Sequence, residues 1–91
     1  MDVKKYSVEI SPRARRKLDK LDAPVRKRIE NWIDKNLDGC ENPRHRGKPL
    51  EGDFAGQWRY RVGDWRIIAE IQDDKIIILI INVDKRNDIY K

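Results

Sequence analysis

Hydrophobic and polar residues alternate near the start of the chain. Tyr6, Val8 and Ile10 are separated by Ser7 and Glu9. This period of two is typical of a half-buried strand, because successive side chains of a strand point to opposite faces of the sheet. We therefore predict a first strand from about residue 4 to residue 10.

The next segment predicts two amphipathic helices. Ser11 and Pro12 are typical of a helix start, with the serine as N-cap and the proline as the first helical residue. The second helix should begin near Asp22 and Pro24, and Gly39 should close it just past its C-cap. The apolar positions are Ala14, Leu18 and Leu21 in the first helix and Val25, Ile29, Trp32, Ile33 and Leu37 in the second. Because almost nothing separates the helices, we expect an antiparallel hairpin packed on a sheet.

The last third of the chain predicts three strands in an antiparallel meander. The strands cover about 58–62, 65–71 and 75–82, and the turns between them are Gly63-Asp64 and Asp73-Asp74. Two-residue turns of this kind favour tight hairpins. Residues 38 to about 57 are rich in glycine, proline and charge, and they predict a long connection anchored by Leu50 and Phe54.

Together these elements predict an α+β fold. An N-terminal strand, a two-helix hairpin and a three-stranded antiparallel meander would place both helices on one face of a four-stranded sheet. The length of 91 residues suits one domain, so we expect residues 1–91 to form a single domain. Apolar residues make up 38% of the chain and charged residues 41%, which predicts a thin core beneath a highly charged surface.

The Gly63-Asp64 turn predicts which side chains are neighbours across the first hairpin of the meander. Counting outward from it, Arg61 falls directly opposite Arg66, and Arg59 lies on the same face. Like charges in opposite positions destabilise a sheet by up to about 1 kcal/mol, so the cluster suggests a bound anion. The alternative is that the arginines are solvated on an open sheet face, with Glu70 neutralising one of them.

The same count from the Asp73-Asp74 turn places Ile71 opposite Ile76 and Arg66 opposite Ile81. The face beneath the helices would then carry Trp58, Tyr60, Val62, Trp65, Ile67, Ala69, Ile71, Ile76, Ile78 and Ile80. The open face would carry the three arginines together with Ile68, Glu70, Ile77, Leu79 and Ile81.

The charge balance favours a polyanionic partner. Lysine and arginine number 21 against 16 acidic residues, a net charge of +5, so nucleic acid is the leading candidate, ahead of an acidic protein or an anionic membrane. No stretch has the pattern of a membrane-lying helix. The basic residues that we expect to contact RNA beyond the sheet are Arg13, Arg15, Arg16, Lys17, Lys20, His45 and Arg46.

Few residues suit other chemistry. Cys40 is the only cysteine and His45 the only histidine, so we expect no intrachain disulfide, no metal site and no cofactor. The N-terminus lacks the apolar core of a signal peptide, and the longest aliphatic run, Ile76 to Ile81, is too short to cross a bilayer. These features predict a cytoplasmic protein.

The chain resembles the RelE/ParE superfamily of toxins from prokaryotic toxin–antitoxin pairs. The resemblance rests on the stretch GKPLEGDFAGQWRYRVGDWRIIAEI, the ending VDKRNDIY and the predicted order of strands and helices. It covers nearly the whole chain and is strongest from Gly47 to Tyr90.

The resemblance implies an activity and a set of site residues. Toxins of the RelE branch enter the ribosomal A site and cut messenger RNA there, by attack of a 2′-hydroxyl on the neighbouring phosphate. The matching catalytic positions of this chain are Arg59, Arg61, Arg66, Arg86 and Tyr90. Tyr90 would accept the 2′-hydroxyl proton, and Arg59 or Arg61 would hold or protonate the leaving side. The implied partners are a RelB-like antitoxin, the ribosome and messenger RNA, with no membrane involved.

Arg59 and Arg61 depart from the family pattern, which usually has lysines at these two places. Arginine has a pKa above about 12 and is a poor proton donor, so the identity of the general acid stays open. We predict negligible cutting of free RNA, because the ribosome must supply the substrate geometry.

Two other functions compete with this one. A toxin of the ParE branch inhibits DNA gyrase by protein contact and needs neither the basic cleft nor Tyr90. A simple RNA-binding module could use the basic helix from Arg13 to Lys20. Aromatic residues on the open face would favour that module, but the predicted register puts the tryptophans on the other side.

Overall fold

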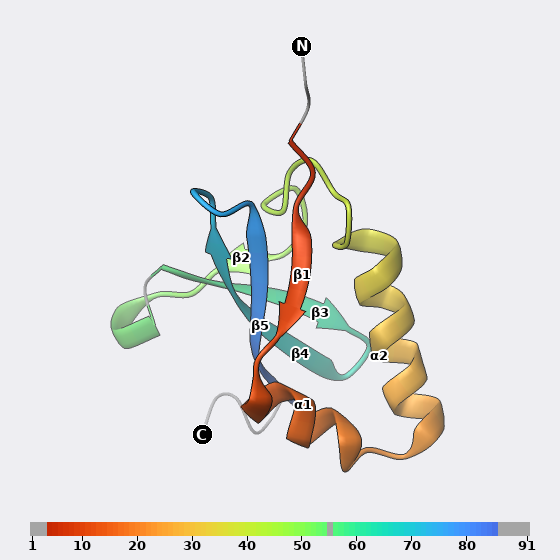
Figure 1. Ribbon diagram of the computed structural model, residues 1–91. Helices are drawn as coiled ribbons and strands as arrows, with labels where there is room; N and C mark the ends of the chain where they lie inside the picture. The colour runs from red at the N-terminus through yellow and green to blue at the C-terminus, as the bar shows by residue number, and fades with distance from the viewer. Residues whose placement is uncertain (1–3, 55, 86–91) are drawn as a thin grey trace.

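The computed structural model describes residues 4–54 and 56–85, which form five strands and two α-helices (Figure 1). In chain order the elements are β1 (Ser7–Ile10), α1 (Pro12–Asp19), α2 (Ala23–Asn36), β2 (Lys48–Pro49), the short 3₁₀ helix η1 (Gly52–Phe54), β3 (Gln57–Val62), β4 (Trp65–Gln72) and β5 (Ile77–Lys85). The predicted α+β order is confirmed. The two-residue strand β2 was not predicted, so the sheet has five strands instead of four.

The strands form one sheet in the order β1-β5-β4-β3-β2. β1 runs parallel to β5, and the other neighbouring strands are antiparallel. Figure 1 shows α2 running along one side of the sheet and α1 lying at its lower end. The two helices lie across one another in this view, so the predicted antiparallel helix hairpin is wrong, although both helices pack on the same face of the sheet.

The helix boundaries follow the predicted capping residues. The Ser11 hydroxyl accepts a hydrogen bond from the Ala14 N–H at 3.2 Å, as expected of an N-cap serine. The second helix ends at its C-cap Leu37, and Gly39 follows with a left-handed φ of +81°. An ion pair of 2.9 Å between Arg15 and Glu30 ties the two helices together.

The core lies between the helices and one face of the sheet. Its buried members are Ala14, Leu18, Ile29, Ile33, Leu37, Tyr60, Val62, Ile67, Ala69, Ile78, Ile80 and Val83. Trp58 and Trp65 are partly buried against it. The predicted helix-side face is therefore largely confirmed, with Val83 as an addition.

The β3–β4 hairpin has the predicted register. Arg61 lies opposite Arg66, and Arg59 lies opposite Ile68. Gly63, in the turn, has a φ of +60°, a conformation that glycine adopts without a steric penalty.

The predicted register of the β4–β5 hairpin is wrong. The turn takes up residues 73–76 instead of two aspartates alone, and the Ile76 N–H donates to the Asp73 carbonyl at 3.3 Å. Ile76 therefore belongs to the turn, with a φ of +57°, and Ile71 lies opposite Ile78. Counting from a two-residue turn missed this because a β-branched residue is a poor candidate for that conformation.

A β-bulge shifts the same hairpin further. It lies beside the step from Ile68 to Ala69, and Ile81 is the extra residue of β5. As a result Arg66 lies opposite Asp84, not opposite Ile81 as predicted. A bulge leaves the alternation intact on either side of it, so the pattern of apolar residues did not reveal it.

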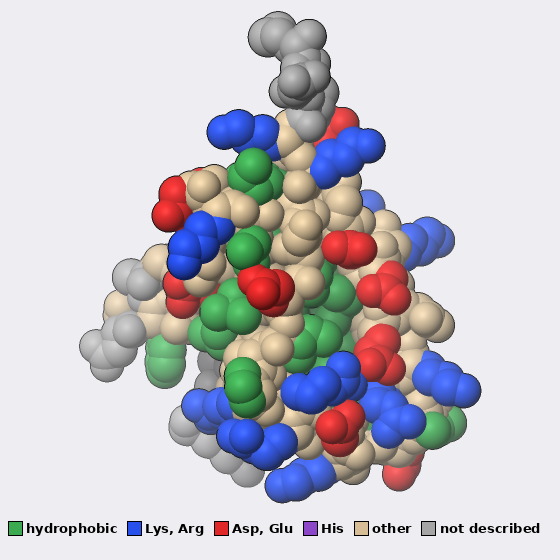
Figure 2. Space-filling model, in the orientation of Figure 1, with side chains coloured by type: hydrophobic (Ala, Val, Ile, Leu, Met, Phe, Trp, Pro, Cys, Tyr) green, Lys and Arg blue, Asp and Glu red, His purple; other side chains and the backbone are tan. Residues whose placement is uncertain are grey.

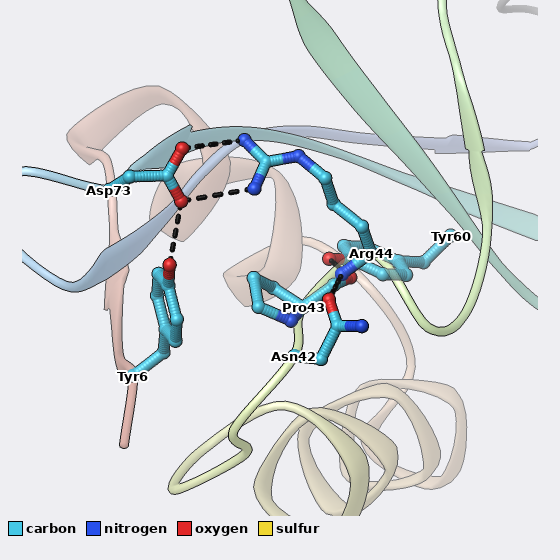
Figure 3. Close-up of polar contacts among 6 residues, drawn as sticks. All are labelled: Tyr6, Asn42, Pro43, Arg44, Tyr60 and Asp73. Carbon is cyan, nitrogen blue, oxygen red and sulfur yellow. Dashed lines mark hydrogen bonds and ion pairs between the residues drawn. The ribbon is translucent and has the colours of Figure 1, made fainter. Parts of the chain in front are cut away.

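The connection between α2 and β3 is anchored by polar contacts (Figure 3). Arg44 makes two ion-paired hydrogen bonds of 3.0 and 2.9 Å to Asp73, and the Tyr6 hydroxyl donates to the same carboxylate at 2.6 Å. The Tyr60 hydroxyl donates to the Pro43 carbonyl at 2.5 Å. These bonds hold the loop against the β4–β5 turn and the start of the chain.

The expected anchor Phe54 does not serve that role. It is 59% exposed, whereas Leu50 is partly buried. The Trp58 indole instead holds the loop, through a hydrogen bond of 2.6 Å to the Arg46 carbonyl.

Candidate nucleic-acid interface

The three arginines of the β3–β4 hairpin lie on the open face. Strand alternation places Arg59 and Arg61 on one side of β3 and their partner Arg66 on the same side of β4. Arg61 is exposed and Arg59 partly exposed, whereas only 6% of Arg66 is exposed. Arg61 is thus the most exposed of the three residues, and its Nε donates a hydrogen bond of 3.2 Å to the Gly63 carbonyl.

Lys48 extends this basic face and was missed by the sequence analysis. It lies in β2 directly opposite Arg59, so a second pair of like charges meets across the sheet. A Cβ on the preceding Gly47 would lie 2.2 Å from the Arg59 carbonyl oxygen. The Gly47-Lys48 pair was therefore a usable signal, because such close backbone approach requires glycine.

Asp84 is an acidic group within the basic face, contrary to the predicted register. It lies opposite Arg66, and both of its oxygens accept hydrogen bonds from Lys17, at 2.8 and 2.7 Å. The burial of Arg66 is thus accompanied by an opposite charge on the neighbouring strand, as a buried guanidinium requires. The face stays basic because Lys17 compensates the carboxylate.

A groove of about 1020 Å³ runs over part of this face, and it is lined by Arg59 but not by Arg61 or Arg66. Its apolar surfaces include Leu50, Phe54, Ile68 and Ile81. Of these, Ile68 is 5% exposed and therefore buried. The groove therefore offers apolar contact as well as charge.

Basic side chains line the groove on both sides. Lys48 and Arg59 come from β2 and β3, and Arg13 comes from the first turn of α1. Arg13 is the member of the predicted basic helix that reaches the groove. Figure 2 shows lysine and arginine side chains gathered around the lower end of the molecule, where α1 lies.

The other predicted RNA contacts lie elsewhere. Arg15 is paired with Asp19 and Glu30, and its bond to Glu30 is the main cause that raises the pKa of its guanidinium. Lys17 is paired with Asp84. Arg16 lies on α1 and Lys20 is its C-cap residue, and neither lines the groove.

His45 and Arg46 line a separate hollow of about 230 Å³ beside Cys40. Burial raises the pKa of the Cys40 thiol. Within residues 4–54 and 56–85 no group of three or more histidine, cysteine or acidic side chains could hold a metal ion. No helix in the same part of the chain is long and apolar enough to span a membrane.

The described tyrosines Tyr6 and Tyr60 do not line the groove. Tyr60 is buried, and this burial is the main cause that raises its pKa. Tyr6 is hydrogen-bonded to Asp73, which raises its pKa as well. The predicted catalytic residues Arg86 and Tyr90 lie outside the described residues.

Solved structures with this fold include toxins of the RelE type. One chain of the toxin–antitoxin complex RelBE2 from Mycobacterium tuberculosis matches with a TM-score of 0.83 and 29% identity, over 93% of this chain and 95% of that chain. The isolated RelE toxin of E. coli matches with a TM-score of 0.71 and 24% identity, over 93% and 90% of the two chains. The predicted fold class is confirmed.

The sequence comparisons agree with the fold. A family model described as the ParE toxin of the type II toxin–antitoxin system parDE matches residues 8–90. The chain belongs to this family, within the RelE/ParE superfamily, and is a toxin of a type II toxin–antitoxin system. The toxin RelG of Mycobacterium tuberculosis (strain ATCC 25618 / H37Rv) is 33% identical over 86 residues, which are 94% of this chain and 97% of that one. The toxin RelE of the same strain is 30% identical over 86 residues, which are 94% and 87% of the two chains.

Proposed function

We propose that this toxin is a ribosome-dependent endoribonuclease that cuts messenger RNA in the A site. The observation that carries the proposal is the pairing of Arg61 with Arg66 on the open face, next to Arg59 and Lys48. Three arginines and a lysine on one face make a basic surface, and the phosphate backbone of RNA is a matching polyanion. The relatives named RelG and RelE support the same reading.

The proposed reaction is an internal transesterification. The 2′-oxygen of one nucleotide forms a bond to the adjacent phosphorus, and the bond from phosphorus to the 5′-oxygen of the next nucleotide breaks. One proton leaves the 2′-hydroxyl and one is delivered to the leaving 5′-oxygen. The products are a 2′,3′-cyclic phosphate and a 5′-hydroxyl.

Guanidinium groups suit the charged intermediate of this reaction. The phosphorane carries additional negative charge, and fixed donors aimed at its oxygens lower the barrier, typically by about 2.7–4 kcal/mol each. We assign this role first to the exposed Arg61, with Arg66 as a buried charge behind it and Arg86 as a third donor. Tyr90 is our candidate for the group that takes the 2′-hydroxyl proton.

The ribosome is proposed as an obligatory part of the active complex. The groove is partly open to solvent, so it does not by itself hold a flexible RNA in line for attack. Bound in the A site, the messenger would be held from the opposite side. We therefore expect protein alone to leave naked RNA essentially intact.

An antitoxin is the second proposed partner. Solved relatives include a RelE–RelB complex from Pyrococcus horikoshii OT3, and we propose that a RelB-like antitoxin binds this chain too. Ile77 and Leu79 are partly exposed on the open side of β5, and Figure 2 shows hydrophobic side chains gathered near β1 and β5. An amphipathic segment with acidic residues would match this surface.

Induction in growing cells tests the proposed activity. Primer extension on a translated message should map new ends inside codons, and growth should stop. Arg86→Ala and Tyr90→Ala should abolish both effects, whereas Lys35→Ala on the exposed side of α2 should change neither. Growth arrest without new ends in the message would contradict the proposal.

Gyrase inhibition is the second candidate, because the matching family model is described as a ParE toxin. It predicts that purified protein blocks DNA supercoiling by gyrase and that toxicity survives both tail substitutions. A supercoiling assay with the wild-type protein separates the two functions. Normal supercoiling in the presence of excess toxin supports the nuclease.

A further inference from the structure

Phe54 is an exposed aromatic residue at the edge of the basic groove. It is 59% exposed, and it is the one large hydrophobic side chain classed as exposed in the described part of the chain. It ends η1 and lines the groove together with Lys48 and Arg59. Leaving so much aromatic surface in water forfeits the burial that stabilises most phenylalanines.

The residues around Phe54 suit a single-stranded nucleic acid. Proteins bind such strands by pairing basic side chains with the phosphates and stacking aromatic rings on the bases. Here Lys48 and Arg59 supply the charge, and Gln57 adds an amide that can donate and accept hydrogen bonds at a base edge. From β2 to β5 the groove crosses three strand spacings, roughly 14 Å.

We propose that Phe54 is a stacking platform for a nucleobase of the bound messenger RNA. The proposal rests on the function proposed above and deepens it, because it assigns a contact to a base instead of the backbone. The ring lines the groove together with Lys48 and Arg59, and Arg59 lies two residues before Arg61 on the same face of β3. The base it holds would therefore flank the cut, and the stacking would bias which codons are cut.

Basic side chains and an exposed aromatic ring in one groove are the combination that binds single-stranded RNA. The basic groups Lys48, Arg59 and Arg13 line it, and Lys17 compensates Asp84, the acidic group on the β5 side. Glu51 is an exposed acid at the other side. An antitoxin segment is the alternative occupant, and the experiment below distinguishes the two.

Binding of a short single-stranded RNA containing 2-aminopurine tests the platform without needing cleavage. The fluorescence of this base falls when it stacks, and labelled RNA gives the affinity by anisotropy at low salt. Loss of one aromatic stacking contact weakens binding roughly 5- to 150-fold. We expect this loss for Phe54→Ala and for Phe54→Leu, while Phe54→Trp keeps both the affinity and the quenching.

The leucine variant and one control make the test specific. Leucine keeps most of the apolar area but has no aromatic face, so equal binding by Phe54→Leu and the wild type would overturn the proposal. Val25→Ala removes partly exposed apolar surface on α2, outside the groove, and should leave RNA affinity unchanged. If Phe54→Ala binds RNA normally but loses its co-expressed antitoxin, the ring contacts protein and the proposal is wrong.

Failure of the platform and failure of the proposed function give different results. Suppose that the wild-type protein quenches 2-aminopurine through Phe54 yet leaves translated messages uncut. The stacking platform would then stand, and the proposed nuclease activity would be wrong. If the wild-type protein cuts messages and Phe54→Ala cuts the same codons at the same rates, the function stands and the platform is wrong. A shifted distribution of cut codons supports both.

Discussion

The two hairpins of the sheet look alike in sequence and differ in structure. Both turns contain aspartate, but β3 and β4 meet through a tight turn at Gly63, whereas β4 and β5 meet through residues 73–76 with Ile76 in a left-handed conformation. The first hairpin is regular, and the second carries a bulge. A glycine at the turn is thus a better guide to register than the aspartate beside it.

The two hairpins also contribute opposite charges to the candidate site. The regular hairpin brings Arg61 against Arg66, and the bulged hairpin brings Asp84 to the other side of Arg66. The positive charge of the open face therefore depends on the first hairpin, and the nearest acidic group comes from the second. The predictions below separate these contributions.

The largest expected effect is on cleavage, from the regular hairpin. Arg61→Ala should slow cutting on the ribosome at least about 100-fold, the usual cost of losing one oxyanion donor. The same change relieves a like-charge pair, so the free energy of unfolding should be unchanged or up to about 1 kcal/mol higher. Primer extension and urea unfolding measure the two quantities.

Lys75→Ala, in the turn of the bulged hairpin, is the control and should leave cleavage as in the wild type. Equal losses of cleavage in both variants would contradict the role assigned to Arg61.

Substitutions in the two turns should change the free energy of unfolding in opposite directions. Gly63→Ala forces a side chain into a positive φ, against the flexible Arg28 guanidinium 2.8 Å from the new Cβ, and should destabilise the protein by about 1–2 kcal/mol. Ile76→Asn puts a tolerant residue into the same kind of conformation and should stabilise by up to about 1 kcal/mol. Urea unfolding of both variants measures these changes. A stabilising Gly63→Ala would show that the turn does not need glycine.

Asp84→Asn should change stability and RNA binding in opposite senses. Lys17 loses a partly buried partner, which should cost about 1 kcal/mol of unfolding free energy. The groove loses a negative charge, so its affinity for RNA should be higher. That affinity should also decrease more steeply as salt is added. Asp19→Asn, at an exposed pair on α1, is the control for general charge. Weaker RNA binding by Asp84→Asn would mean that the carboxylate helps to shape the site.

The smallest expected effect concerns the polar cluster at the turn of the bulged hairpin. The hydrogen bonds from Arg44 and Tyr6 lower the pKa of Asp73 from 3.8 to about 2. Its stabilisation should therefore be complete above about pH 4 and vanish as the pH falls through 2. Because the Asp73 side chain is 54% exposed, we expect less than about 1 kcal/mol.

Comparison with a neighbouring aspartate checks this pH dependence. Asp73→Asn should be less stable than the wild type at pH 5, and the difference should shrink as the pH falls toward 2 and disappear below it, by urea unfolding at each pH. Asp74→Asn changes an exposed carboxylate in the same turn and should track the wild type throughout. A constant difference between Asp73→Asn and the wild type would exclude titration as the cause.

The sequence predicts the helices and the first hairpin because local chemistry determines them. Ser11 caps its helix, Gly63 permits its turn, and alternation separates Tyr60 from Arg61. Each of these depends on residues close together in the chain. The basic face follows from them without knowledge of distant contacts.

What the sequence does not predict depends on contacts between distant segments. The bulge that brings Asp84 opposite Arg66, and the pairing of Lys48 with Arg59, join parts of the chain with no shared local pattern. Phe54 was expected to be an anchor because aromatic residues usually are, and its exposure appears only when the groove is formed. The features of the site that the sequence did not predict are therefore those that depend on tertiary contacts.

The central claim is that this basic face cuts messenger RNA only on the ribosome. Its most direct test is a single-turnover assay with purified ribosomes whose A site holds a defined codon, followed by identification of the new 3′ end. The account predicts one cut within that codon, a 2′,3′-cyclic phosphate at the end, and no product from the same RNA without ribosomes. An uncut message on the ribosome, or rapid cutting of naked RNA, would contradict it.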